Sequence, residues 1–125
     1  MTDANPLILI ADDDALVLST LAEIFERSGF RVLAVSNGQE AIEAARAARP
    51  TVLLLDIVMP QLDGVAVAMQ IMPLLPGAQI FLISGDHRAA SILENAKTEG
   101  YEFNVFSKPT PPEALLSTIR LPHRR

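Results

Sequence analysis

The chain has 125 residues, a net charge of −5 at neutral pH, 50% hydrophobic residues and no cysteine. This length and hydrophobic content fit one domain with a buried core and exclude a disordered chain, while the lack of cysteine excludes disulfides and thiolate metal sites. The negative charge argues against direct binding to nucleic acid, and no apolar run is long enough to cross a membrane. The polar start has none of the features of a secretory signal. We expect one cytoplasmic domain over residues 1–125, with a core from about 6 to 120 and short tails.

The first third of the chain predicts a strand, a helix and a second strand. Residues 7–10 are a continuous aliphatic run, which indicates a short strand. A helical period begins at Asp14, which we interpret as the N-cap, and Ser28-Gly29 ends it. Residues 31–35 again have the composition of a strand.

The middle of the chain predicts a second helix, a central strand and a short third helix. Asn37 and Glu40 have the spacing of a capping box, so a helix is predicted to begin there. Residues 52–56 are apolar up to the final aspartate, which is typical of a strand that is buried on both faces. The third helix is predicted from Val65 until Pro73 interrupts it.

The last third of the chain continues the alternation. Residues 80–83 predict a fourth strand, and the apolar residues that follow at helical spacing predict a fourth helix ending at Gly100. Residues 103–106 predict a fifth strand. Thr110 and Glu113 have the spacing of a capping box with two prolines between them, so a fifth helix is predicted from this point.

This alternation of strands and helices determines the expected fold class. We predict an α/β domain in which a single doubly wound, parallel, five-stranded sheet is flanked by five helices on its two faces. Ligands of such sheets bind outside the carboxyl ends of the strands. The residues that follow the strands are therefore the candidates for a functional site.

Charged and hydroxyl side chains stand at those strand ends: Asp12, Asp13, Asp56, Ser84 and Lys108. Three carboxylates at one edge repel one another, and a hard divalent cation with oxygen ligands would relieve that repulsion. Mg²⁺ is favoured, with Mn²⁺ as an alternative, because Mg²⁺ keeps waters that a phosphate can replace. Lys108 would balance phosphoryl charge and Ser84 would offer a hydrogen bond, which leaves Asp56 on the most buried strand as the nucleophile.

Four motifs in this order closely resemble the receiver domain of two-component response regulators: Asp12-Asp13, Asp56-Ile-Val-Met-Pro-Gln-Leu-Asp-Gly64, Ser84-Gly85 and Lys108-Pro109. The resemblance covers nearly the whole chain. It implies a flavodoxin-like fold with strand order 2-1-3-4-5. It also implies a signalling switch that accepts a phosphoryl group on Asp56 from a histidine kinase or a histidine phosphotransfer protein. Apart from promoting its own phosphorylation and dephosphorylation, such a domain is not expected to be an enzyme.

The resemblance also implies roles for individual residues. Asp13 and Asp56 would bind Mg²⁺ together with the backbone carbonyl of Val58, and Asp12 would act mostly through water. Ser84 and Lys108 would hold the phosphoryl oxygens, and Asp63-Gly64 is interpreted as turn chemistry. An output protein would bind the face of the fourth helix, fifth strand and fifth helix, with no direct contact to nucleic acid or membrane. The candidate exposed apolar residues of that face are Ile92, Val105 and Leu116.

One position departs from the family pattern. Val105 stands three residues before the lysine, where most receivers have an aromatic ring that swings inward on phosphorylation. Strand alternation places Phe106 on the opposite face, in the core. The segment leading to the lysine is one residue longer than the common pattern, and a shifted strand would bring Tyr101 or Phe103 into that position. We hypothesise that output depends more on the loop after Ser84 and on the fourth helix than on a rotating ring.

Three other classes of function are open alternatives. A receiver-like interaction module without phosphorylation control is compatible with Val105, although the intact carboxylates, hydroxyl and lysine argue against it. A flavodoxin-like cofactor binder would need a glycine- and hydroxyl-rich loop after the first strand, where the acidic residues would instead repel a phosphate. A phosphatase with an aspartyl nucleophile would need a second aspartate two residues further on, and that position is Val58.

Overall fold

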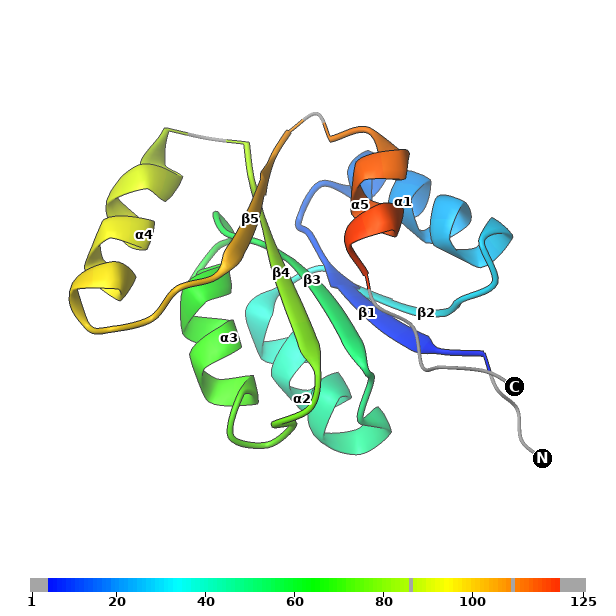
Figure 1. The fold of residues 1–125 in the computed structure, drawn as a ribbon, viewed down its shortest axis with the longest axis horizontal. Coiled ribbons are helices and arrows are strands. Elements are labelled where there is room, and N and C mark those ends of the chain that lie inside the picture. The colour runs from blue at the N-terminus through cyan, green and yellow to red at the C-terminus, as the bar shows by residue number, and fades with distance from the viewer. Residues whose placement is uncertain (1–4, 86, 109, 120–125) are drawn as a thin grey trace.

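Five parallel strands form one sheet in the order β2-β1-β3-β4-β5 at the centre of the computed structural model (Figure 1). The structure describes residues 5–85, 87–108 and 110–119. The strands are β1 (Leu7–Ala11), β2 (Arg31–Val35), β3 (Val52–Asp56), β4 (Gln79–Ser84) and β5 (Asn104–Ser107). The helices are α1 (Ala15–Arg27), α2 (Gly38–Ala48), α3 (Gly64–Ile71), α4 (Arg88–Thr98) and α5 (Pro112–Thr118). The predicted fold class and strand order are confirmed.

Two positions near the candidate site residues lie outside the described residues. Pro109, from the last of the four motifs, is one of them, and Asp86, in the loop after Ser84, is the other. Within the described ranges, no helix is both long enough and apolar enough to cross a bilayer.

The helices cover the two faces of the sheet, with α1 and α5 on one side and α2, α3 and α4 on the other (Figure 1). Each side has its own hydrophobic cluster. β3 is buried along its whole length, and its side chains alternate between the clusters. Leu53 and Leu55 pack towards α2 and α3, whereas Val52 and Leu54 pack towards α1. The prediction of a central strand buried on both faces is therefore confirmed, and this strand carries Asp56 to the carboxyl edge.

Two of the predicted helix starts have the expected caps. Asp14 is the N-cap of α1, and its Oδ1 accepts hydrogen bonds from the N–H groups of Leu16 and Val17 at 3.0 and 3.2 Å. Asn37 caps α2 by accepting from the N–H of Glu40 at 2.8 Å. The reciprocal bond of the capping box is displaced by one residue, because the Glu40 carboxylate accepts from the N–H of Ser36.

The capping box predicted at Thr110 is wrong. The N-cap of α5 is Pro111, which offers no side-chain bond, and the helix begins at Pro112. The Thr110 hydroxyl instead donates to the backbone carbonyl of Ser107 at the end of β5. Two consecutive prolines explain the delay, since the residue before a proline is disfavoured in helical geometry while proline itself suits the first helical turn.

β5 pairs with β4 in regular register, one residue later than predicted. Val105 lies opposite Leu82 and Phe106 lies opposite Ile83. Phe106 packs into the cluster beside α1 and α5, as expected, whereas Tyr101 and Phe103 stack together against the other cluster, with ring centroids 6.3 Å apart. Neither aromatic takes the register position of Val105, whose side chain is 38% exposed. The alternative of a shifted strand that brings a ring to this position is therefore wrong.

Candidate functional site

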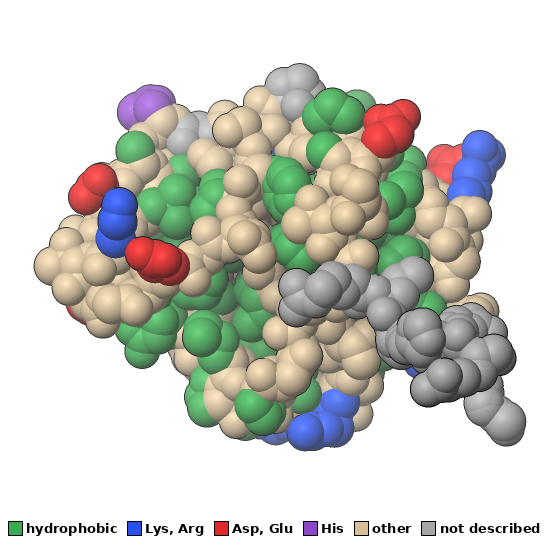
Figure 2. All heavy atoms as spheres, viewed as in Figure 1, with side chains coloured by type: hydrophobic (Ala, Val, Ile, Leu, Met, Phe, Trp, Pro, Cys, Tyr) green, Lys and Arg blue, Asp and Glu red, His purple; other side chains and the backbone are tan. Residues whose placement is uncertain are grey.

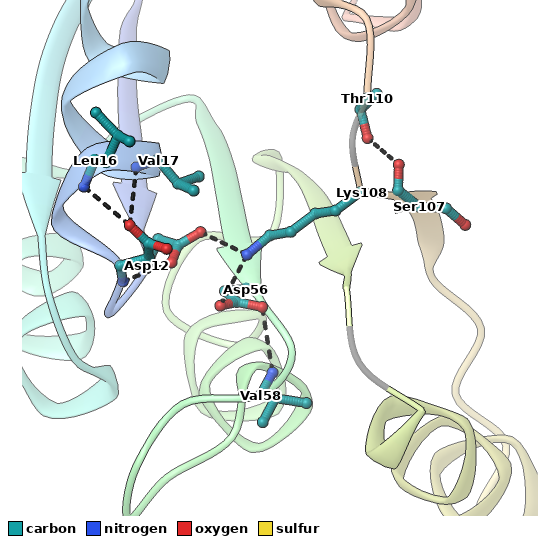
Figure 3. Close-up of polar contacts among 9 residues, drawn as sticks. Asp12, Leu16, Val17, Asp56, Val58, Ser107, Lys108 and Thr110 are labelled. Carbon is teal, nitrogen blue, oxygen red and sulfur yellow. Dashed lines mark hydrogen bonds and ion pairs between the residues drawn. The ribbon is translucent and has the colours of Figure 1, made fainter.

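Three strand ends converge on one pocket at the carboxyl edge of the sheet (Figure 3). Its volume is about 610 Å³, and the lining includes Asp12, Asp13, Asp56, Val58, Gly85 and Lys108. The two acidic residues that follow β1, the aspartate that ends β3 and the lysine that follows β5 are thus brought together, as the parallel sheet predicts. Arg88, at the start of α4, also lines the pocket. It was not among the sequence candidates, because no motif includes it.

Lys108 lies between two carboxylates (Figure 3). Its Nζ donates to Oδ2 of Asp12 at 3.0 Å and to Oδ2 of Asp56 at 3.3 Å. Both carboxylates are buried, with Asp12 1% and Asp56 6% exposed. Buried charges require compensation by partners, and one ammonium group here provides it to two acids.

The remaining carboxylate oxygens accept backbone hydrogen bonds. Oδ1 of Asp12 accepts from the N–H of Asp14 at 2.9 Å, and Oδ1 of Asp56 accepts from the N–H of Val58 at 3.4 Å. These bonds fix the orientation of both side chains relative to the loops after β1 and β3. The two acids are therefore held in place before any ligand arrives.

The charges in the pocket shift the proton equilibria of Asp56 and Lys108. Burial, with the nearby charge of Asp12, raises the pKa of Asp56 from 3.8 to about 6, although the charge and hydrogen bond of Lys108 oppose this. Burial alone would lower the pKa of Lys108, but the hydrogen bond to Asp12 and the negative charges of both acids raise it above its ordinary value. At neutral pH the lysine is charged.

The donor set of the pocket fits a hard divalent cation. One oxygen from each of Asp12, Asp13 and Asp56 lies within 4.8 Å of the others. Oxygen ligands of this kind suit Mg²⁺. Burial raises the pKa of Asp56 most, the negative charge of Asp12 adds to the rise, and a cation in the pocket would oppose both effects. Val58 lines the same pocket, and the role of its backbone carbonyl stays a prediction.

Ser84 stands beside the pocket without being part of its lining among the described residues. It ends β4, is half-buried, and its backbone carbonyl accepts from the N–H of Lys108 at 2.8 Å. The backbone of Ser84 is therefore coupled to the lysine. The role of its hydroxyl stays a prediction.

The turn at Asp63 and Gly64 caps α3 and also packs closely against the end of β3. Asp63 is the N-cap of α3 and accepts from the N–H of Ala66 at 2.8 Å, which confirms the interpretation as turn chemistry. Gly64 packs against the strand end, because a Cβ atom built on it would lie 2.3 Å from the backbone oxygen of Asp56. The close approach was not foreseen, and the only sequence signal for it is the glycine itself.

A second cavity, of about 570 Å³, lies between α1 and α5. Its lining is largely apolar and includes Leu16, Val17, Ile24 and Leu115, with Lys108 at one side. Val17 and Lys108 also line the acidic pocket, so the two cavities are neighbours. Leu16 is 74% exposed, the highest value among the exposed large hydrophobic residues described.

Comparisons with known proteins agree with this geometry. A family model for the response regulator receiver domain matches residues 8–120. The chain is 30% identical over 113 residues to the chemotaxis protein CheY of Thermotoga maritima, covering 90% of this chain and 92% of that protein. It is 37% identical over 67 residues to the alkaline phosphatase synthesis transcriptional regulatory protein PhoP of Bacillus subtilis, of which it covers 28%. The crystal structure of a response regulator receiver protein from Sinorhizobium medicae is similar, with a TM-score of 0.78, 29% identity and 90% of each chain covered.

Proposed function

This chain belongs to the family of response regulator receiver domains, and we propose that it is a phosphorylation-activated switch whose phosphoacceptor is Asp56. The observation that carries the proposal is the position of the Asp56 carboxylate. It is buried at the end of the central strand, in one pocket with two further aspartates and a lysine. A carboxylate held in this way can attack phosphorus, while its surroundings neutralise the charge of the phosphoryl oxygens.

The proposed reaction is a single displacement. A carboxylate oxygen of Asp56 forms a bond to phosphorus as the bond between phosphorus and the donor breaks, and the electron pair of that bond leaves with the donor. The protein donor is a histidine kinase or a histidine phosphotransfer protein, whose imidazole nitrogen is the leaving atom. Asp56 must be ionised to attack, and a cation in the pocket favours that state.

Asp12, Asp13, Asp56 and the backbone carbonyl of Val58 are the proposed holders of Mg²⁺, with Mn²⁺ as the alternative. The cation would supply charge neutralisation at the phosphoryl oxygens. Lys108 supplies a second positive charge, since its Nζ lies 3.3 Å from Oδ2 of Asp56. Ser84 is proposed to donate a hydrogen bond to a phosphoryl oxygen.

The proposed output surface is the face formed by α4, β5 and α5. Figure 2 shows hydrophobic side chains gathered over the middle of this face, with the charged side chains towards its edges. Val105 is exposed there, whereas Ile92 and Leu116 are half-buried. An apolar centre with a polar rim is the usual composition of a protein-binding surface.

The proposal is tested by incubating the chain with acetyl phosphate and Mg²⁺ and measuring the intact mass. We expect the mass of one phosphoryl group to be added, and the addition to be lost when Mg²⁺ is chelated or when Asp56 is changed in Asp56→Asn. Asp63→Asn is the matched control, because it removes a carboxylate outside the pocket and asparagine is an equally good N-cap.

The control variant must still be phosphorylated. If several small phosphodonors leave the wild-type chain unmodified, and beryllofluoride does not bind in the presence of Mg²⁺, the phosphorylation switch is wrong. The interaction module without phosphorylation control would then be the better description.

A further inference from the structure

Arg88 brings a second positive charge to the acidic pocket. It is the first residue of α4, its side chain is exposed, and it lines the same pocket as the three aspartates and Lys108. Among the described residues of that lining, Lys108 and Arg88 are the two that carry a positive charge. Lys108 already donates to two carboxylates, whereas the proposed reaction gives Arg88 no part.

The charges of the pocket balance before phosphorylation but not after it. A bound divalent cation and Lys108 together carry three positive charges, and the three aspartates of the pocket, when ionised, carry three negative charges. Phosphorylation replaces the single charge of the Asp56 carboxylate by nearly two negative charges on the phosphoryl group. The excess lies beside carboxylates that are almost fully buried, where water screens it little. The positive charge of Arg88 is enough to cancel it.

The start of α4 is suited to an anion that arrives in the pocket. Its N-cap residue, His87, makes no side-chain capping bond, and its first turn has no acidic residue. The positive end of the helix dipole favours a nearby anion and disfavours a cation such as Arg88. A phosphoryl group held close to Arg88 would pair with the guanidinium group and complement the dipole at the same time.

We propose that Arg88 is a phosphoryl-binding residue, which pairs with the phosphoryl group once that group is on Asp56. A guanidinium group suits this role because its planar set of N–H donors can bind two phosphoryl oxygens at once. The inference rests on the proposed function and adds to it a direct connection between the phosphoryl group and the first turn of α4. This connection requires no aromatic ring at the position of Val105.

The test measures the affinity for beryllofluoride, a mimic of the phosphoryl group, by calorimetry in saturating Mg²⁺ at low salt. Arg88→Met keeps most of the length of the side chain and removes its charge. It should bind beryllofluoride about threefold to tenfold more weakly than the wild type, as expected for a charge-assisted pair that is partly exposed. Its affinity for Mg²⁺ alone should not fall, because the variant removes a positive charge and no ligand of the cation.

Lys97→Met is the matched control, and Arg88→Lys tests the geometry. Lys97 is in the last turn of α4 and does not line the pocket, so its loss changes the net charge equally at the other end of the same helix. The control should bind beryllofluoride as the wild type does. Arg88→Lys keeps the charge without the fork of donors, so its affinity should lie between those of the wild type and Arg88→Met. Raising the salt from about 0.02 to about 0.5 M should reduce the difference between the wild type and Arg88→Met, because salt screens an exposed pair.

Hydrogen exchange measures the connection to α4 independently of affinity. With beryllofluoride and Mg²⁺ at saturating concentrations, the site is filled equally in the wild type and in Arg88→Met. The change in exchange that beryllofluoride produces in α4 should nevertheless be smaller in Arg88→Met, because the side chain that connects the helix to the bound group is missing.

Equal affinities for beryllofluoride in the wild type and Arg88→Met would overturn the proposal, and so would an equal loss in Lys97→Met or an undiminished response of α4 in Arg88→Met. A parallel loss of Mg²⁺ affinity in Arg88→Met would also overturn it, since that result would show general damage to the pocket. In each of these cases, beryllofluoride binding by the wild type leaves the proposed function standing. If the wild type binds no beryllofluoride in the presence of Mg²⁺, the proposed function fails and the role of Arg88 fails with it.

Discussion

In the charge cluster of Asp12, Asp56 and Lys108, one ammonium group compensates two buried carboxylates. The lysine lies 3.0 and 3.3 Å from the two carboxylates, and both acids are almost fully removed from water. One positive charge cannot fully offset two negative ones at these distances. Burial, and with it the uncompensated negative charge of Asp12, raises the pKa of Asp56 to about 6.

This raised pKa predicts how the stability of the metal-free protein depends on pH. The folded chain holds a proton on Asp56 up to about pH 6, whereas the unfolded chain releases it near 3.8. The folded state therefore binds more protons in this window, and the free energy of unfolding should fall as the pH rises from 4 towards 7. The part due to Asp56 is up to about 3 kcal/mol.

The measurement is chemical denaturation of the wild type and Asp56→Asn at several pH values, with divalent cations chelated. Asparagine does not titrate, so the difference in unfolding free energy between the two proteins should change across the window. Parallel curves would show that the proton affinity of Asp56 does not change on folding. Adding Mg²⁺ should stabilise the wild type more at pH 7 than at pH 5, because ligand carboxylates must be ionised.

The sequence could predict the convergence of Asp12, Asp56 and Lys108, but not how they pair. Their convergence follows from topology, because parallel strands place their carboxyl ends at one edge. The double ion pair of Lys108 depends on side-chain rotamers, which no periodicity encodes. The place of Ser84 beside the pocket, rather than in its lining, depends in the same way on a loop conformation.

At the scale of elements, α1 presents an apolar residue next to the acidic pocket. Leu16 is 74% exposed and lines the cavity between α1 and α5, which adjoins the acidic pocket through Val17 and Lys108. A protein donor must bring its histidine to Asp56, so its surface has to contact this region. Burying the exposed side chain of Leu16 against the donor would stabilise such a contact by removing apolar surface from water.

We predict that Leu16→Ala weakens transfer from a protein donor without affecting a small one. The rate from a phosphorylated histidine phosphotransfer protein that serves the wild type should fall by about tenfold, the effect of losing a good apolar contact. The rate with acetyl phosphate should stay unchanged, because the side chain of Leu16 does not line the acidic pocket. Met72→Ala, which truncates an exposed apolar residue at the end of α3, is the control. An equal loss of rate with both donors would show instead that Leu16 stabilises the pocket itself.

Helices and strands differed in how closely their ends could be predicted. Gly29 and Gly100, both with positive φ, mark the ends of α1 and α4 as the sequence indicates, because glycine adopts that conformation without steric cost. The start of α5 and the position of β5 were each misplaced, the latter by one residue. The local sequence signals compete in this segment: two prolines delay the helix, and the Thr110 hydroxyl donates to the carbonyl of Ser107 instead of capping α5. The position of the short strand β5 is determined by its pairing with β4.

At the scale of the whole molecule, the anchoring of the helices is uneven. α3 fully buries five residues, whereas α4 fully buries two, and both of these are alanines, Ala89 and Ala96. Since stabilisation by burial scales with apolar area, α4 is held more weakly. Its first residue, Arg88, also lines the acidic pocket.

We therefore predict that α4 responds most to activation. Hydrogen exchange measured with and without beryllofluoride and Mg²⁺ should change in α4 by about tenfold or more and stay constant in α2. Val105 has no ring to rotate, and Tyr101 and Phe103 stack against each other, half-buried, on the hydrophobic cluster that includes Ala89 and Ala96 of α4. Constant exchange in α4, together with a new rotamer of either ring, would contradict this prediction.

The hydrogen bond between Lys108 and Asp12 joins residues 96 positions apart in the chain. On the ribosome, both buried acids are made long before the lysine that compensates them. Before Lys108 is made, Asp12 and Asp56 lack the ammonium group that compensates them, and we expect that a divalent ion from the surrounding solution can take its place. If the pocket binds Mg²⁺ as proposed, depletion of Mg²⁺ should reduce the yield of folded chain as well as its phosphorylation.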